Sequence, residues 1–316
     1  MRSLTLAFSS HRPETLPYAE TAMRGHDAIV LEEPEHPQFS GMLSGEVSIQ
    51  DYLLESEYEY PDFARGLCQI LRRFAAAGIP ILQVDPFMDE LAAIHERFAD
   101  GQSPRDIEPG TVAHTVYSSE RTWTAALIAF YRASVTADFD SVVRAVKIFA
   151  RADAARGRLR DRMRARALAG LADNYGRIYV ETGYIHQYLP YVLKRLLPEV
   201  RIERRWLTAT VVRRETGKTR VMGPGDALTV ACTFKPGFDG PAADLMAARS
   251  LIHVKALSKE EMIPDRDNPT PHTMDEIEVG RLVSALSYED CRRLYDRTRG
   301  LSTVRARKIL AEFANK

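Results

Sequence analysis

The sequence predicts an α/β protein with an open, mainly parallel sheet flanked by helices. Two observations support this prediction. Short apolar runs of strand length alternate with longer segments of helical periodicity, and each run stops at glycine, proline or ionisable residues. A helix that connects two strands returns the chain to the start of the sheet, so the strands that it joins run parallel.

Four strands and three helices are predicted in the part of the chain that builds this sheet. The strands cover residues 4–8, 28–31, 79–84 and 175–181. The helices cover residues 14–24, 61–77 and 88–98. The run 28–31 is apolar throughout, as expected for a strand buried on both faces. Residues 35–60 are acidic and irregular, which predicts a flap or short helices over the strand ends.

The rest of the chain is predicted to be helical, apart from one hairpin. Residues 121–174 have helical periodicity with a break near residues 137–138. Two strands, over 206–214 and 227–234, are predicted to form a C-terminal β-hairpin, followed by helices. This pattern predicts an α/β core domain over residues 1–198, which carries the site, and a hairpin-plus-helical region over 199–316 packed on the core.

Composition excludes several classes of protein. Lys and Arg together number 43, as do Asp and Glu, so net charge gives no reason to expect nucleic acid or an anionic membrane as a partner. The three cysteines have no paired spacing, which is typical of reduced thiols. No apolar run approaches the ~18 residues of a membrane span, and no signal-peptide pattern is present. We therefore expect a cytoplasmic protein that does not bind membranes.

One segment, residues 151–166, is dense in arginine. Its arginines are Arg151, Arg156, Arg158, Arg160, Arg162, Arg164 and Arg166. Asp153 and Asp161 lie among them, which favours a helix face with internal charge pairs. An anion-binding helix and a nucleic-acid-binding helix are the alternatives, and the absence of interleaved aromatic residues lowers the case for single-stranded nucleic acid.

Polar residues follow every predicted strand of the core. They are Ser9, Ser10 and His11 after the first strand, Glu32 and Glu33 after the second, Asp85 after the third, and Glu181 and His186 after the fourth. Ligands of open α/β sheets bind outside the carboxyl ends of the strands, so these groups are expected to share one site.

Two imidazoles and a carboxylate form a known catalytic metal set. We therefore expect His11, Glu32 and His186 to bind one divalent metal, Mn, Zn or Co, and to activate water. The same groups without metal are suited to general acid–base catalysis. Glu33 and Asp85 are expected to support them, although Glu33 is also suited to a helix cap and Asp85 to a turn.

The order of these motifs resembles the TraB and TIKI group, which is distantly related to the erythromycin-esterase-like and ChaN-like proteins. The resemblance covers residues 4–197. The second Gly-x-x-His motif is intact at Gly183 and His186, the Arg-Asp stretch stands at Arg160 and Asp161, and Glu32 and Asp85 are in register. The first motif departs from the family, because Phe8 stands where glycine is expected and Ser9 where the esterase-like members have glutamate.

The resemblance implies a hydrolytic α/β domain, since TIKI-like members are metal-dependent peptidases, while other members bind ligands such as haem. Our first hypothesis is a metal-dependent hydrolase acting on a small molecule or peptide, with Arg160 holding an anionic substrate group or transition state. The alternatives are a non-catalytic protein that binds a small anionic or haem-like ligand, and an RNA-associated protein. A homo-oligomer is compatible with each of them.

Overall fold

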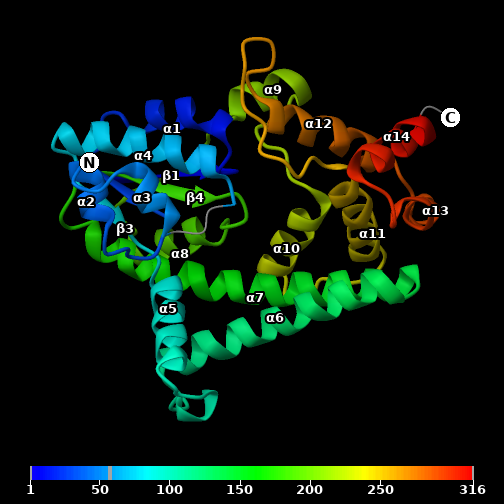
Figure 1. Cartoon of the computed structure of the whole chain (residues 1–316), viewed down its shortest axis with the longest axis horizontal. Coiled ribbons are helices and arrows are strands. Elements are labelled where there is room, and N and C mark those ends of the chain that lie inside the picture. Colours follow the sequence, from blue (N-terminus) through cyan, green and yellow to red (C-terminus); the bar gives the residue numbers. More distant parts are fainter. Residues whose placement is uncertain (1, 56–58, 315–316) are drawn as a thin grey trace.

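The structure, a computed structural model, describes residues 2–55 and 59–314. Its centre is one sheet of five parallel strands in the order β3-β2-β4-β1-β5 (Figure 1). The strands are β1 (Ser3–Ser9), β2 (Ala28–Leu31), β3 (Ile81–Gln83), β4 (Arg177–Gly183) and β5 (Arg201–Trp206). Helices flank this sheet, so the predicted α/β fold is confirmed.

The helices that follow β1 and β2 cover one face of the sheet. They are η1 (Pro13–Thr15), α1 (Leu16–Met23), α2 (Phe39–Ser44), α3 (Ile49–Leu54) and α4 (Pro61–Ala76). On β2, Ile29 and Leu31 pack against this layer and Val30 packs against the opposite one, which confirms that the strand is buried on both faces. The predicted helix over 61–77 is confirmed by α4. The described part of the irregular region 35–60 forms the short helices α2 and α3, and residues 56–58 lie outside the described residues.

The opposite face is covered by α7 (Phe139–Leu171) and α8 (Leu189–Leu196). The long helix α7 also joins the two halves of the molecule (Figure 1). Its C-terminal part packs on the sheet through Ala165 and Leu168, and its N-terminal part packs on the C-terminal helices through Val142 and Val146. The predicted break at residues 137–138 separates α7 from α6 (Val112–Thr136).

Two further elements connect β3 with the α6–α7 pair. They are α5 (Pro86–Ala99) and η2 (Pro104–Asp106).

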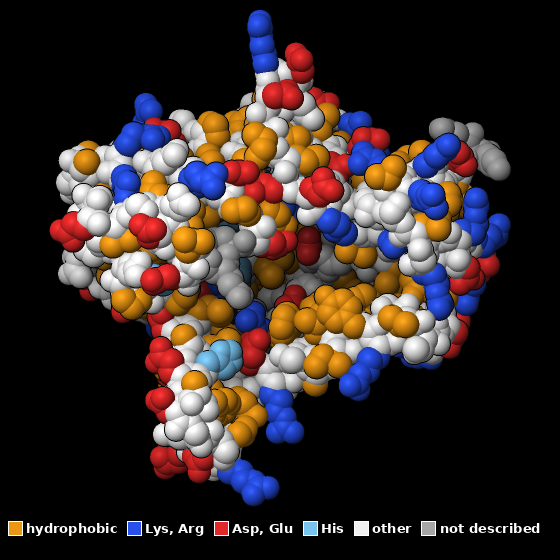
Figure 2. All heavy atoms as spheres, viewed as in Figure 1, with side chains coloured by type: hydrophobic (Ala, Val, Ile, Leu, Met, Phe, Trp, Pro, Cys, Tyr) orange, Lys and Arg blue, Asp and Glu red, His pale blue; other side chains and the backbone are white. Residues whose placement is uncertain are grey.

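Hydrophobic side chains gather over α6 in Figure 2, and its Ile128, Tyr131 and Val135 are exposed. Among the described residues, no helix combines the length and the apolar character that crossing a membrane requires.

The predicted C-terminal hairpin is wrong. Residues 201–206 form β5, which pairs with β1 at the edge of the main sheet, and residues 209–216 and 224–234 are helical. Leu228 and Cys232 lie one helical turn apart and pack into the core formed with α7, so tertiary burial overrides the β-branched composition of this segment. The C-terminal helices are α9 (Ala209–Thr216), α10 (Pro224–Phe234), α11 (Pro241–Ala256), α12 (Pro271–Ser284), α13 (Tyr288–Thr298) and α14 (Thr303–Ala314).

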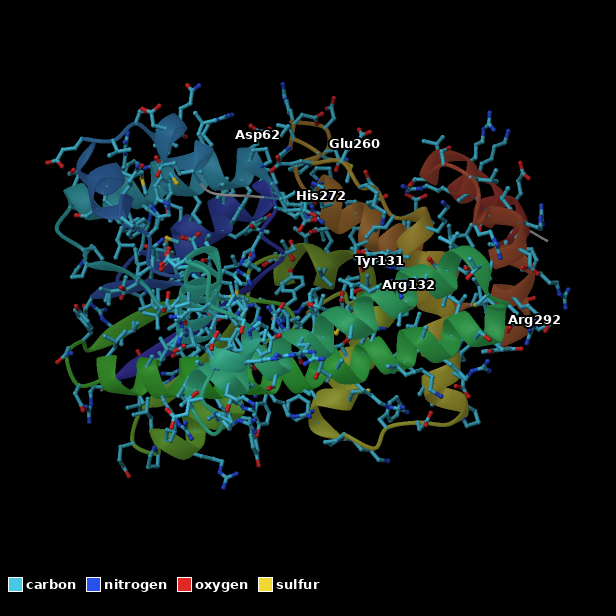
Figure 3. The ribbon with its side chains drawn as sticks, turned by 60° about the horizontal axis from the view of Figure 1, so that its bottom comes forward. Asp62, Tyr131, Arg132, Glu260, His272 and Arg292 are labelled. Atoms are coloured by element: carbon cyan, nitrogen blue, oxygen red, sulfur yellow. The ribbon has the colours of Figure 1, made fainter. Side chains whose placement is uncertain are left out.

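Two glutamates cap helices of the opposite half of the molecule. The buried Glu14, which follows β1, accepts the backbone N–H groups of His272 and Thr273 at the start of α12, both at 2.7 Å. Glu261 accepts the N–H groups of Asp62 and Phe63 at the start of α4. Figure 3 shows Asp62 and His272 in this region. Because carboxylates are favourable at helix N-termini, these contacts fix the two halves relative to each other.

Candidate active site

The ionisable residues that follow β1, β2 and β4 meet at one edge of the sheet. β4 lies between β1 and β2, and Ser9 pairs in register with Gly183. His11, Glu32 and His186 consequently line the same cavity. Phe8, which occupies the glycine position of the first motif, is fully buried and stacks on Trp206 of β5, with ring centroids 4.5 Å apart.

Glu32 is the centre of a buried ion network. Its carboxylate lies 2.9 Å from Nε2 of His186, 3.2 Å from Arg160 and 3.3 Å from Arg164. It also accepts the backbone N–H of Gly183 at 2.6 Å. Burial would raise the pKa of Glu32, but the charges of His186, Arg160 and Arg164 hold it well below its usual value. Glu32 is therefore ionised and fully committed to neighbouring protein groups.

His186 lies between two carboxylates. Nδ1 is 2.5 Å from Asp161 and Nε2 is 2.9 Å from Glu32. Burial lowers the pKa of the imidazole, but the two carboxylates prevail and raise it to about 9. His186 is thus an imidazolium near neutral pH, with both nitrogens engaged as donors.

Asp85, Arg160 and Arg164 complete the network. Arg160 donates from Nε to Asp85 at 2.7 Å, and Asp85 also accepts the N–H of Met88 as the N-cap of α5. Arg164 donates to the backbone carbonyls of Val84 and Glu181, at 3.0 and 2.8 Å. The negative charges of Glu32, Asp85 and Asp161 thereby balance three positive charges. The cations are His186, Arg160 and Arg164. Sequence reasoning missed the role of Arg164, although its spacing of four residues from Arg160 places both on one helix face.

His11 and Glu181 form a second, more open group. Nε2 of His11 lies 3.7 Å from the Glu181 carboxylate and has no hydrogen-bond partner among the described residues. Glu181 accepts the backbone N–H of Glu32 at 3.2 Å. His11 has a φ of 52°, in the left-handed region that a side chain with a Cβ seldom occupies. Such strain is typical of functional positions, where the surrounding structure enforces it.

Glu33 adds a carboxyl group that is protonated part of the time near neutral pH. Burial and the nearby charge of Glu181 raise its pKa to about 7, while a hydrogen bond of 3.0 Å from Gln83 opposes the shift. Glu33, Glu181 and His11 all line a hollow of about 280 Å³. A carboxyl group with this pKa is suited to giving or taking a proton near neutral pH.

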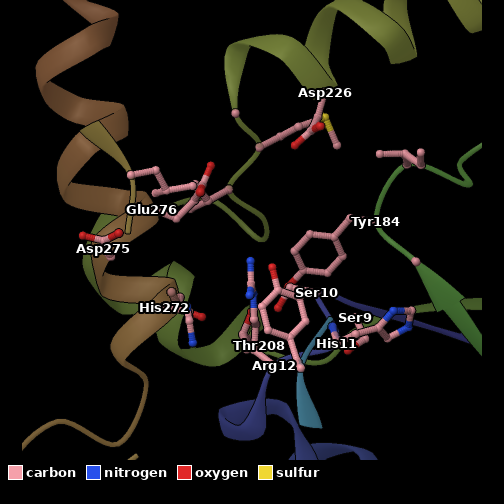
Figure 4. A pocket seen from close by; sticks show the side chains of 18 of the residues that line it. Ser9, Ser10, His11, Arg12, Tyr184, Thr208, Asp226, His272, Asp275 and Glu276 are labelled. Carbon is pink, nitrogen blue, oxygen red and sulfur yellow. Dashed lines mark hydrogen bonds between the residues drawn. The ribbon is translucent and has the colours of Figure 1, made fainter. Parts of the chain in front are cut away.

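A larger cavity of about 610 Å³ opens from the same edge of the sheet towards the C-terminal helices. Ser9, Ser10, His11 and Arg12 lie on one side of it, and Asp226 and Glu276 lie across from them (Figure 4). Its volume falls in the range of small-molecule sites. Residues 199–316, for which the sequence suggests no site residue, therefore supply one wall of the cavity.

The predicted metal ligands do not form a single set of free donors. Among the described residues, no group of three or more His, Cys, Asp or Glu is arranged to hold a metal ion. Both nitrogens of His186 face carboxylates, so the residues His11, Glu32 and His186 do not fit one ion in this arrangement. Metal binding stays a prediction from the sequence.

Most of the arginine-rich segment has internal partners. Arg151 pairs with Asp239, Arg156 with Glu120, Arg158 with backbone carbonyls of α10, and Arg160 and Arg164 with the buried network. Arg162 and Arg166 are exposed. Four of the seven arginines, Arg151, Arg156, Arg160 and Arg164, form ion pairs, and their acidic partners lie outside α7. The expected pairing with Asp153 and Asp161 is wrong, because Asp153 accepts from Trp123 and Asp161 pairs with His186.

The chain is 30% identical over 297 residues to an uncharacterised protein of Archaeoglobus fulgidus. The similarity covers 93% of this chain and 98% of the archaeal protein, so it extends over both halves of the molecule. No family model and no solved structure matches the chain.

Proposed function

The chain belongs to the same family as the Archaeoglobus fulgidus protein, and we propose that it is a hydrolase in which His11 and Glu181 activate a water molecule. The observation that carries the proposal concerns His11, which lines a cavity of substrate size. Its Nε2 has no hydrogen-bond partner among the described residues and lies 3.7 Å from the Glu181 carboxylate. The resemblance to the TraB and TIKI group supports a hydrolytic reaction on this scaffold.

In the proposed mechanism His11 is the general base. Glu181 faces Nε2, so it stabilises the positive charge that develops when Nδ1 takes a proton from water. The distance of 3.7 Å is long for a hydrogen bond, and such contacts commonly shorten when substrate binds. Glu33, with a pKa of about 7, is the nearby group suited to protonating a leaving group.

The buried ion network positions these residues. Glu32 holds the loop after β4 through the Gly183 N–H, and its own N–H donates to Glu181. Arg160 pairs with Asp85 and Glu32, so its charge is balanced within the protein and is not free for an anionic substrate. We propose that removal of any member displaces Glu181 relative to His11, which affects the rate through geometry.

The test is hydrolysis of three substrate classes by the purified protein: a p-nitrophenyl ester, p-nitrophenyl phosphate and a mixture of fluorogenic peptides. His11→Asn and Glu181→Gln are the test variants, because asparagine tolerates the left-handed backbone of residue 11 and glutamine retains the shape of glutamate. We expect each variant to lose about 10²-fold or more in kcat/KM, the usual contribution of general base catalysis.

The exposed His95→Gln variant is the control and is expected to retain wild-type turnover. Equal kcat/KM for wild-type and Glu181→Gln protein, with both folded, would contradict the proposal.

A second candidate function is non-catalytic binding of a small anionic ligand. It is favoured by Arg12, a cavity-lining cation that forms no ion pair with any described residue. Saturable binding of a ligand together with the absence of turnover in all three substrate classes would favour this function over hydrolysis.

A further inference from the structure

The large cavity presents charged side chains from both halves of the chain. Its aspartate, glutamate and arginine residues are Arg12, Glu32, Glu59, Arg160, Asp226, Asp275 and Glu276. Five of them are paired. Glu32 and Arg160 belong to the buried network, Tyr60 donates to Glu59, Arg307 pairs with Asp275, and His253 lies 3.2 Å from Glu276.

Asp226 and Arg12 are the two exceptions in the described lining. Asp226 lies in the first turn of α10, and its carboxylate forms no hydrogen bond or ion pair with any described residue. Its side chain is exposed to the cavity, yet the surrounding protein and the charge of Glu276 raise its pKa to about 6. The protein therefore supplies too little positive charge to compensate this carboxylate.

Arg12 lies on the opposite wall, directly after His11. Its guanidinium stacks 3.5 Å from the centroid of the Tyr60 ring, which fixes its orientation but leaves its donors unpaired among the described residues. Figure 4 shows Arg12 and Asp226 on different sides of the open space. Two unpaired charges of opposite sign consequently face one cavity.

We propose that the cavity binds a zwitterionic small molecule, with its protonated amine at Asp226 and its anionic group at Arg12. Charge-assisted hydrogen bonds to both ends would satisfy the two unpaired groups and place the ligand beside His11. This inference rests on the proposed function, because it names the substrate class of the same site. The anionic end is a carboxylate or a phosphate, since a guanidinium binds both groups with the same geometry.

The test measures binding, which needs no turnover. Calorimetry and thermal shift are recorded with glycine, β-alanine, γ-aminobutyrate and ε-aminohexanoate, a series that varies the separation of the two charges. Phosphoethanolamine replaces the carboxylate by phosphate. Butylamine and butyrate carry one charge each. We expect one zwitterion to bind at least about tenfold more tightly than either single-charge probe, the difference for one additional charged hydrogen bond.

Asp226→Asn and Arg12→Gln are expected to lower the affinity for that zwitterion about tenfold or more, to the level of a single-charge probe. Arg266→Gln and Asp267→Asn, in an exposed loop away from the cavity, are the matched controls and keep wild-type affinity. The melting temperature of each unliganded variant checks its fold.

Equal affinity for zwitterions and single-charge probes overturns the inference, as does undiminished binding by folded Asp226→Asn protein. Glu181→Gln protein is expected to bind the zwitterion as wild type does. If that variant also retains wild-type turnover, the proposed mechanism fails while the binding inference stands.

Discussion

Nε2 of His186 lies 2.9 Å from the Glu32 carboxylate, in a buried contact that joins the turn after β4 to the end of β2. Glu32 is ionised and His186 is protonated near neutral pH, since the pKa of the carboxyl is lowered and that of the imidazole is raised. Each charge stabilises the other. The contact is therefore weakened at low pH, when Glu32 takes up a proton, and at high pH, when His186 loses one.

The first prediction is a loss of stability at alkaline pH. The pKa of His186 rises from 6.5 to about 9 on folding, so its contribution is fully present below pH 6.5 and is lost as the pH rises through 9. His186→Gln leaves Glu32 and Asp161 without their shared cation, and we expect it to lower the free energy of unfolding at pH 6 by about 3–5 kcal/mol. Urea denaturation at pH 6, 7.5 and 9.5 measures both effects.

The exposed His95→Gln variant is the control for this experiment and should follow the wild-type curve. A wild-type stability that is constant between pH 6 and 9.5 would contradict the raised pKa of His186.

The second prediction concerns Glu33, whose pKa rises from 4.5 to about 7. The folded state binds the proton more tightly than the unfolded state, so this group lowers stability as the pH rises from 4.5 to 7. Glu33→Gln keeps an acceptor for Gln83 and removes the titrating group. Between pH 4.5 and 7, we expect the free energy of unfolding of wild type to fall by about 1–3 kcal/mol more than that of the variant. Parallel curves for the two proteins would contradict the assignment.

The sheet and the meeting of its strand ends could be predicted because the signals are local. Ala28 to Leu31 form an apolar run, and the parallel-sheet rule then places Glu32 near residues that follow the neighbouring strands. The pairing of Asp161 with His186 could not be predicted, since an arginine-rich helix has similar composition whether its charges face solvent or a buried site. β5 was missed because its charged, partly exposed residues lie at the sheet edge and lack an apolar run.

The α10 segment shows a different limit of sequence reasoning. Its Thr229, Val230 and Thr233 favour a strand by composition. In the structure Leu228 and Cys232 pack on α7, and this contact with a distant part of the chain stabilises the helical conformation. Asp226 is brought to the cavity by that helix, so an error in secondary structure also hid a candidate binding residue.

The third prediction addresses the metal that the family resemblance implies. Binding at His186 would require the imidazolium to lose its proton, so affinity for Zn²⁺, Mn²⁺ or Co²⁺ at that residue should increase as the pH rises towards 9. At pH 7 we expect wild-type and His186→Gln proteins, stripped of metal with EDTA, to show the same thermal shift with each ion. A shift at pH 7 that wild type shows and His186→Gln lacks would establish His186 as a ligand and require rearrangement of the network.

The last prediction links the two halves of the chain to the cavity. Glu14 uses Oε2 to accept the His272 N–H and Oε1 to accept the Thr273 N–H, and both residues line the cavity. Glu14→Gln replaces one oxygen by an NH₂ group that faces a backbone donor, so we expect unfolding to require about 1–3 kcal/mol less than in wild type. Since α12 also carries Glu276, loosening its start should weaken ligand binding while leaving the pairing of His11 with Glu181 in place. Denaturation and calorimetry on Glu14→Gln, with exposed Glu46→Gln as the control, measure the two effects. Wild-type affinity in a destabilised Glu14→Gln protein would show that the cavity wall does not depend on this cap.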